Sequence, residues 1–177
     1  MHPNLSFEQA PPISVPFRFF LTAPLFGILA GLLLIWLGPE ALASRWSAGT
    51  LALTHLLSVG FLLQAMCGAL LQFIPVISGG NIWRPRLVAG VLHPLLIVAA
   101  LLLAGGFALS RPLWLLIAAS LFGVGLGSFL LIVGLALWRS PAQGPSIRIL
   151  RLALFGLAVT LILGVFLSSA LGGFGHW

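Results

Sequence analysis

The hydrophobic pattern of this chain consists of five long apolar runs separated by short polar breaks. The runs cover residues 19–37, 50–77, 87–109, 113–138 and 147–171. Each has about 20 residues or more, the length that a helix needs to cross the hydrocarbon core of a bilayer. None shows the strict apolar–polar alternation of a half-buried strand. Because a helix satisfies its backbone hydrogen bonds within one segment, the pattern predicts five transmembrane helices.

The breaks between the runs are short and rich in glycine, proline and serine, the residues that end helices and form turns. They are found at residues 38–39, 78–81, 111–112 and 140–145. Residues 1–16, which precede the first run, are more polar and rich in proline. The pattern therefore predicts an N-terminal arm at 1–16 and a single transmembrane domain at 17–177.

Composition supports an all-α fold in lipid. Of the 177 residues, 60% are hydrophobic and 6% are charged, whereas about a quarter of the residues of a soluble domain are charged. The net charge of +6 would suggest nucleic-acid binding in a soluble protein. Here every basic side chain is an arginine near a predicted helix end, which indicates contact with lipid headgroups instead. We expect an integral membrane helical bundle with no nucleic-acid partner.

The arginines also predict the orientation of the chain. Six of the eight fall on the side of the N-terminus, namely Arg18, Arg84, Arg86, Arg139, Arg148 and Arg151. Only Arg45 and Arg111 fall on the other side. An excess of arginine in short loops marks the cytoplasmic side of a membrane. We therefore expect a multi-pass protein of the bacterial inner membrane with a cytoplasmic N-terminus.

Residues 50–77 differ from the other runs because small and polar side chains gather on one side of the predicted helix. With about 100° of rotation per residue, one arc holds Thr54, His55, Ser58, Ala65, Gly68, Ala69 and Gln72. A face of this kind turns toward protein or a cofactor rather than toward lipid. His55, at the edge of the arc, is expected about one to two turns below the outer surface.

An imidazole at this depth needs a partner, because an unpaired polar group is costly in the bilayer. His55 is therefore either a residue that forms a hydrogen bond between helices or a ligand. Neutral imidazole commonly binds haem iron and copper. Both interpretations are open from this residue alone.

The sequence from His55 to Pro75 resembles the second helix of subunit I in the haem–copper oxidase and nitric oxide reductase superfamily. In that family the helix carries a histidine near its outer end and, further along, a Gly-Ala pair followed by a proline, as Gly68, Ala69 and Pro75 do here. The resemblance implies that His55 is an axial ligand of a haem b iron. The family's orientation, with a cytoplasmic N-terminus, agrees with the distribution of the arginines.

Other features of that family are absent from the sequence. The chain has no tyrosine, and its two acids, Glu8 and Glu40, lie outside the predicted spans. Family members also have many more helices and a set of histidines that holds copper. One chain therefore lacks the residues for a complete oxygen- or nitric-oxide-reducing centre. The resemblance implies a haem-holding protein for electron transfer or haem-dependent redox or gas chemistry, with copper as a weaker alternative and enzymatic activity left open.

His93 is the second candidate metal ligand. It precedes Pro94, whose ring frees a backbone carbonyl that a polar neighbour can use, so a hydrogen-bonding role is favoured and a ligand role is the alternative. His93 lies near the cytoplasmic end of its run and should differ from His55 in depth by about 15–20 Å. Two axial ligands of one iron lie only about 4 Å apart. One chain should therefore not supply both.

A haem at His55 would then take its second ligand from His55 of another copy, from a group other than histidine, or from no residue. A shared haem favours a homodimer, since a two-fold axis brings equivalent residues together, and a homotrimer is also open. Ser58 and Gln72 share the arc with His55 and are candidate cofactor contacts. Arg45 and Trp46, on the outer side, are candidates for binding haem propionates.

The redox partner in this hypothesis is a quinol or a cytochrome. Two other classes of function are also open. A non-enzymatic membrane scaffold or assembly factor would use both histidines for packing. A small metal-handling transporter would line a path with Thr54, His55, Ser58, Gln72 and His93. The lack of an acid within the predicted spans weakens the proton-coupled form of that idea.

Overall fold

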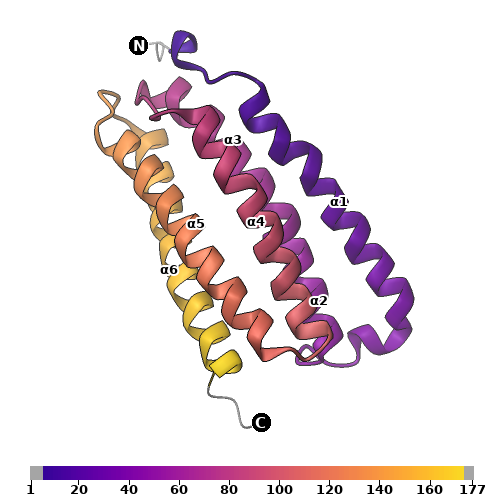
Figure 1. Cartoon of the computed structure of the whole chain (residues 1–177). Helices are drawn as coiled ribbons and strands as arrows, with labels where there is room; N and C mark the ends of the chain where they lie inside the picture. The colour runs from indigo at the N-terminus through magenta and orange to yellow at the C-terminus, as the bar shows by residue number, and fades with distance from the viewer. Residues whose placement is uncertain (1–5, 174–177) are drawn as a thin grey trace.

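The computed structural model describes residues 6–173 as a bundle of helices (Figure 1). Within these residues no strand is present, and five helical stretches are long and apolar enough to cross a membrane. The elements are η1 (Phe7–Gln9), α1 (Ser14–Leu37), η2 (Gly38–Leu42), α2 (Ala48–His55), η3 (Leu56–Leu62), α3 (Leu63–Ser78), α4 (Pro85–Ala108), α5 (Pro112–Trp138) and α6 (Pro145–Gly173). Elements α2, η3 and α3 together form the second span. The all-α prediction and the five predicted spans are confirmed.

Local sequence explains where the helices begin and end. The Ser47 hydroxyl accepts a hydrogen bond from the Thr50 amide at 3.2 Å and caps α2. Gly79 follows α3 with φ of 65°, a left-handed conformation that glycine adopts without a steric cost. Proline occupies the first position of three helices, where no amide donor is needed. These residues are Pro85, Pro112 and Pro145.

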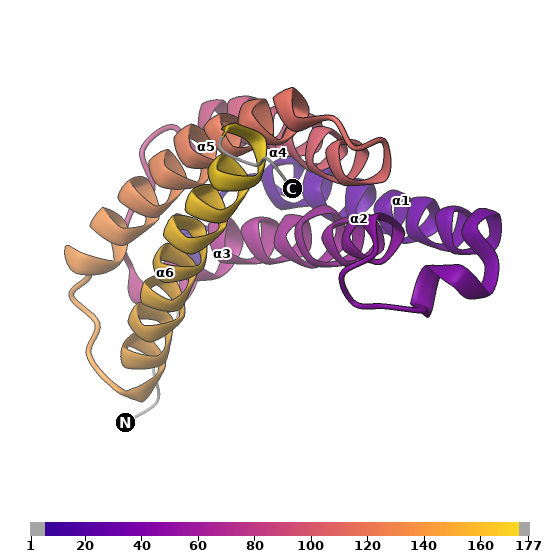
Figure 2. The same ribbon diagram turned by 90° about the horizontal axis from the view of Figure 1, so that it is seen from below.

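Each helix packs mainly against its neighbours along the chain. Helix α1 lies against η3 and α3, α4 packs between the second span and α5, and α6 packs against α5. Figures 1 and 2 both place α1 and α6 at opposite edges of the bundle. Helix α6 buries only Ile147 and Leu154 within the described chain. The interior therefore lies between α1, the second span, α4 and α5, and α6 covers one side.

The arginines lie at the two ends of the bundle as predicted. Arg18 is in the first turns of α1, and the other five of the larger group lie near the starts of α4 and α6 or the end of α5. Arg45 and Arg111 lie in the connections at the opposite end. The folded chain thus carries six arginines at one end of the bundle and two at the other.

The second span is not a uniform α-helix. Its middle seven residues, Leu56–Leu62, form a π-helix that begins directly after His55. Because a π-helix has i to i+5 hydrogen bonds and a wider turn, α3 is rotated relative to the position that a continuous α-helix would give it. The residues of the predicted polar arc do not form one face in the structure. His55 and Ser58 face one way, whereas Gly68 packs against α1.

Two glycines let α1 approach the second span closely. A Cβ atom on Gly60, in η3, would lie 2.3 Å from Cδ1 of Phe26, and one on Gly68, in α3, would lie 2.9 Å from Cβ of Phe19. Phe26 and Phe19 are both buried. Contact between backbone and side chain at this distance is the usual role of small residues between membrane helices. One side of η3 therefore packs against α1, and its other side faces the neighbouring helices.

Candidate cofactor cavity at His55

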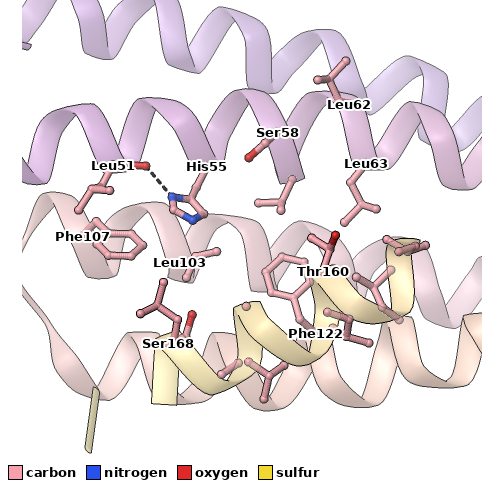
Figure 3. A pocket seen from close by; sticks show the side chains of 18 of the residues that line it. Leu51, His55, Ser58, Leu62, Leu63, Leu103, Phe107, Phe122, Thr160 and Ser168 are labelled. Atoms are coloured by element: carbon pink, nitrogen blue, oxygen red, sulfur yellow. Dashed lines mark hydrogen bonds between the residues drawn. The ribbon is translucent and has the colours of Figure 1, made fainter. Parts of the chain in front are cut away.

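A cavity of about 880 Å³ lies between the second span and helices α4, α5 and α6. Its wall includes His55 and Ser58 from the second span, Phe107 from α4 and Ser168 from α6 (Figure 3). Met66 of the second span also lines it. Most of the other lining side chains are aliphatic. Binding sites for small molecules and cofactors enclose about 300–1,000 Å³ and are mostly apolar with a few polar groups. The cavity therefore has the size and the lining of such a site.

The His55 ring is held in one orientation and points into this cavity (Figure 3). Its Nδ1 lies 2.6 Å from the carbonyl oxygen of Leu51, and because a carbonyl only accepts, Nδ1 carries the proton. The ring also stacks on Phe107, with 4.8 Å between centroids and 23° between planes. In the neutral ring this leaves the lone pair of Nε2 available. Histidines that bind metals commonly donate their other N–H to a carbonyl or carboxylate in this way.

His93 has a different environment, between α4 and α1. Its Nε2 lies 2.8 Å from the Thr22 hydroxyl. That hydroxyl donates its one proton to the Arg18 carbonyl at 2.8 Å, so it accepts a hydrogen bond from His93 Nε2–H. The ring also packs edge-on against Phe19, with 5.0 Å between centroids. These contacts fit the hydrogen-bonding role that the sequence favoured for His93.

The two histidines are far apart in depth. His55 stacks on Phe107, which follows His93 by fourteen residues in the same helix, α4. At 1.5 Å per residue this is about 21 Å. The structure therefore agrees with the expectation that one chain does not bring both histidines to one iron. The part of the chain that the structure describes also has no group of three or more His, Cys, Asp or Glu side chains placed to hold a metal ion.

Of the other predicted cofactor contacts, some line the cavity and others lie outside it. Trp46 lines the cavity, and the Arg45 guanidinium lies 5.1 Å from the centroid of the Trp46 ring. Ser58 also lines the cavity, but its hydroxyl donates to the Thr54 carbonyl at 2.7 Å. Gln72 does not line the cavity, because it follows His55 by 17 residues, which is about 25 Å along the span. The structure therefore does not place Gln72 in the site of His55, contrary to the expectation from the sequence.

The cavity wall opposite His55 was not predicted from the sequence. Thr160, Gly164 and Ser168 of α6 all line the cavity, and their spacing of four residues places them on one side of the helix. This small and polar stripe is the signal that could have identified α6 as part of a site. Phe107 offered no comparable signal, since its ring matters only through its stacking on His55.

Gln64 is a second polar residue whose position the sequence did not reveal. Its side chain is fully buried, and neither Oε1 nor Nε2 has a hydrogen-bond partner within residues 6–173. A buried amide left unpaired costs about 1–3 kcal/mol. We expect Gln64→Leu, which removes the polar atoms at similar volume, to raise the free energy of unfolding by about 1–2 kcal/mol. Thermal unfolding of the purified protein in detergent measures this change.

Gln72→Leu is the matched control for that substitution. Only one polar atom of Gln72, Oε1, is buried without a partner among the described residues, so its replacement should give a smaller gain. A Gln64→Leu protein that unfolds at a lower temperature than the unmodified chain would contradict the prediction and indicate that Gln64 has a partner.

Comparison with known proteins finds no protein-family model, no curated protein and no solved structure that the chain matches. The resemblance of residues 55–75 to a haem-binding helix therefore stays a prediction. The geometry around His55 is the basis for the function proposed below.

Proposed function

We propose that this chain is a haem b-binding protein of the bacterial inner membrane, with a cytoplasmic N-terminus, in which His55 would bind the iron. The observation that carries the proposal is the His55 ring in the cavity wall, with Nδ1 bound to the Leu51 carbonyl and Nε2 available. The sequence resemblance of this helix and the position of six arginines at one end support it.

The residues of the cavity fit this cofactor. Its volume of about 880 Å³ and its largely aliphatic wall suit a large planar apolar group. His55 would hold the iron, and Phe107 would support the imidazole by stacking. Trp46 lines the cavity near Arg45, whose guanidinium is the nearest predicted partner for propionates. When bound, haem supplies one-electron redox chemistry and an iron that binds small gases.

The chain's own residues would orient the ligand and surround the cofactor with apolar side chains. The hydrogen bond to the Leu51 carbonyl selects the tautomer of His55 and makes Nε2 a better electron donor. The walls that α5 and α6 contribute are mostly aliphatic, so a bound cofactor would contact mainly apolar side chains. Electron transfer to a quinol or cytochrome partner, and association with further copies of the chain, belong to the same proposal.

The optical spectrum of the purified protein tests the proposal. Expressed with an adequate haem supply, the protein should be coloured, with a reduced-minus-oxidised spectrum typical of haem b and iron bound in proportion to the chain. The ratio is about one iron per chain, or about one per two chains if two copies share it. A colourless, iron-free protein overturns the proposal. Bound copper or zinc in place of iron would favour the metal-handling alternative, and a metal-free protein the scaffold.

A further inference from the structure

The cavity offers one iron ligand from the protein at the depth of His55. Among the residues that line it, only Met66 besides His55 has a side chain of a kind that binds haem iron. Met66 follows His55 by eleven residues along the same span, which is about 16 Å. Because two axial ligands lie about 4 Å apart, Met66 is too far away. No other described residue of this chain that lines the cavity is therefore placed to bind the iron on the side that faces α6.

Ser168 is the polar group on that side of the cavity. The other hydroxyls in the middle of the spans donate to the carbonyl four residues earlier, as seen for Thr54, Ser58, Ser120, Ser128 and Thr160. Ser168 and Ser169, near the end of α6, form no such bond to any residue between 6 and 173, and of these two only Ser168 lines the cavity. Figure 3 shows its oxygen directed from α6 toward the side on which His55 lies. Its hydroxyl is therefore available to a bound ligand.

The depths of Ser168 and His55 are similar. A Cβ atom on Gly172, in α6, would lie 2.8 Å from the carbonyl oxygen of Pro112, which begins α5. Ser168 is one helical turn, about 6 Å, further into the bundle. His55 stacks on Phe107, in the last turn of α4, just before the connection to α5. The two side chains thus lie within about one helical turn of each other in depth, on facing walls.

From this placement we propose that Ser168 donates a hydrogen bond to a diatomic gas molecule bound on the side of the site opposite His55. The inference rests on the proposed function, because His55 must hold the haem. It adds a ligand class, a small gas with an acceptor atom, and a residue that recognises it. The remaining polar group of α6 in the cavity, Thr160, already donates to the Gly156 carbonyl at 2.9 Å and is less suited to this role.

Carbon monoxide binding to the reduced protein tests the assignment. We expect the unmodified protein to bind carbon monoxide with a shift of its absorption bands. In Ser168→Ala the dissociation constant should rise about two- to ten-fold, the effect of losing one neutral hydrogen bond. The C–O stretching band in the infrared should also move to higher frequency, since a hydrogen bond to the oxygen weakens the C–O bond. Ser168→Thr keeps a hydroxyl and should retain both properties.

Ser169→Ala is the matched control, because it makes the same change one residue along α6 at a side chain that does not line the cavity. It should leave both measurements unchanged. Equal effects of Ser168→Ala and Ser169→Ala, or no effect of Ser168→Ala, would overturn the assignment. So would a haem spectrum that carbon monoxide does not alter, since His55 of another copy would then fill the open side. A protein without haem would instead overturn the proposed function itself.

Discussion

If His55 holds haem as proposed, replacing it by alanine should remove the haem absorption of the purified protein, lowering haem bound per chain by about ten-fold or more. The expected loss is large because His55 Nε2 is the one suitable nitrogen at this depth of the cavity wall. Substitution also removes the stacking on Phe107. The measurement is the reduced-minus-oxidised spectrum at equal protein concentration, together with iron analysis.

A glycine at position 55 separates the loss of the iron ligand from a loss of the fold. His55→Gly leaves space where the ring was, and added imidazole should enter it and restore much of the spectrum. The control is His93→Ala, the same kind of change in another membrane helix. His93 bonds to Thr22 about 21 Å away in depth, so its loss should reduce stability without removing haem. Full haem occupancy in His55→Ala, or its loss only in His93→Ala, would show that the site is elsewhere.

The second large effect is expected at Gly60. Gly60→Ala should lower the free energy of unfolding by about 1–3 kcal/mol, because an added Cβ would lie 2.3 Å from Cδ1 and 2.9 Å from Cβ of the buried Phe26. Alanine favours a helix over glycine by about 1 kcal/mol, which offsets only part of this cost. Because η3 also lines the cavity through Ser58, we expect weaker haem retention as well. Thermal unfolding and haem content measure the two effects.

Two further variants test whether the contact with Phe26 is the cause. Gly127→Ala, in α5, is the control, since no described atom lies within 4 Å of the position its Cβ would take, and it should be neutral or slightly stabilising. The double variant Gly60→Ala/Phe26→Ala should be more stable than the sum of the two single changes predicts, with a coupling of about 1–2 kcal/mol. Additive changes would mean that Gly60 does not act through Phe26.

The spans were predictable because their signal is local. A bilayer requires a continuous apolar stretch of about 20 residues, and this requirement depends only on neighbours along the chain. The predicted run at 113–138 corresponds to α5 at Pro112–Trp138, and the run at 87–109 to α4 at Pro85–Ala108. The grouping of the arginines followed from the same alternation of spans and connections.

The candidate site was predictable only in part. His55 stood out because an imidazole in an apolar run is unusual, and the structure places it in a cavity wall. Gln72, assigned to the same arc, lies outside the cavity because it is 17 residues, about 25 Å, further along the span. The π-helix at Leu56–Leu62 was not predicted either, since no residue type marks one.

The sequence by itself therefore determined that the chain folds in lipid, how many spans it has and at which end most arginines lie. It also identified His55 as the first histidine to test. Each of these follows from hydropathy or charge along the chain. The tertiary structure alone decided which side chains face His55. Ser168 is more than one hundred residues away along the chain, and it shares a cavity with His55 only because α6 packs against α5 at the side of the second span. Contacts between distant helices depend on the packing of all of them, and a single helix pattern does not contain that information.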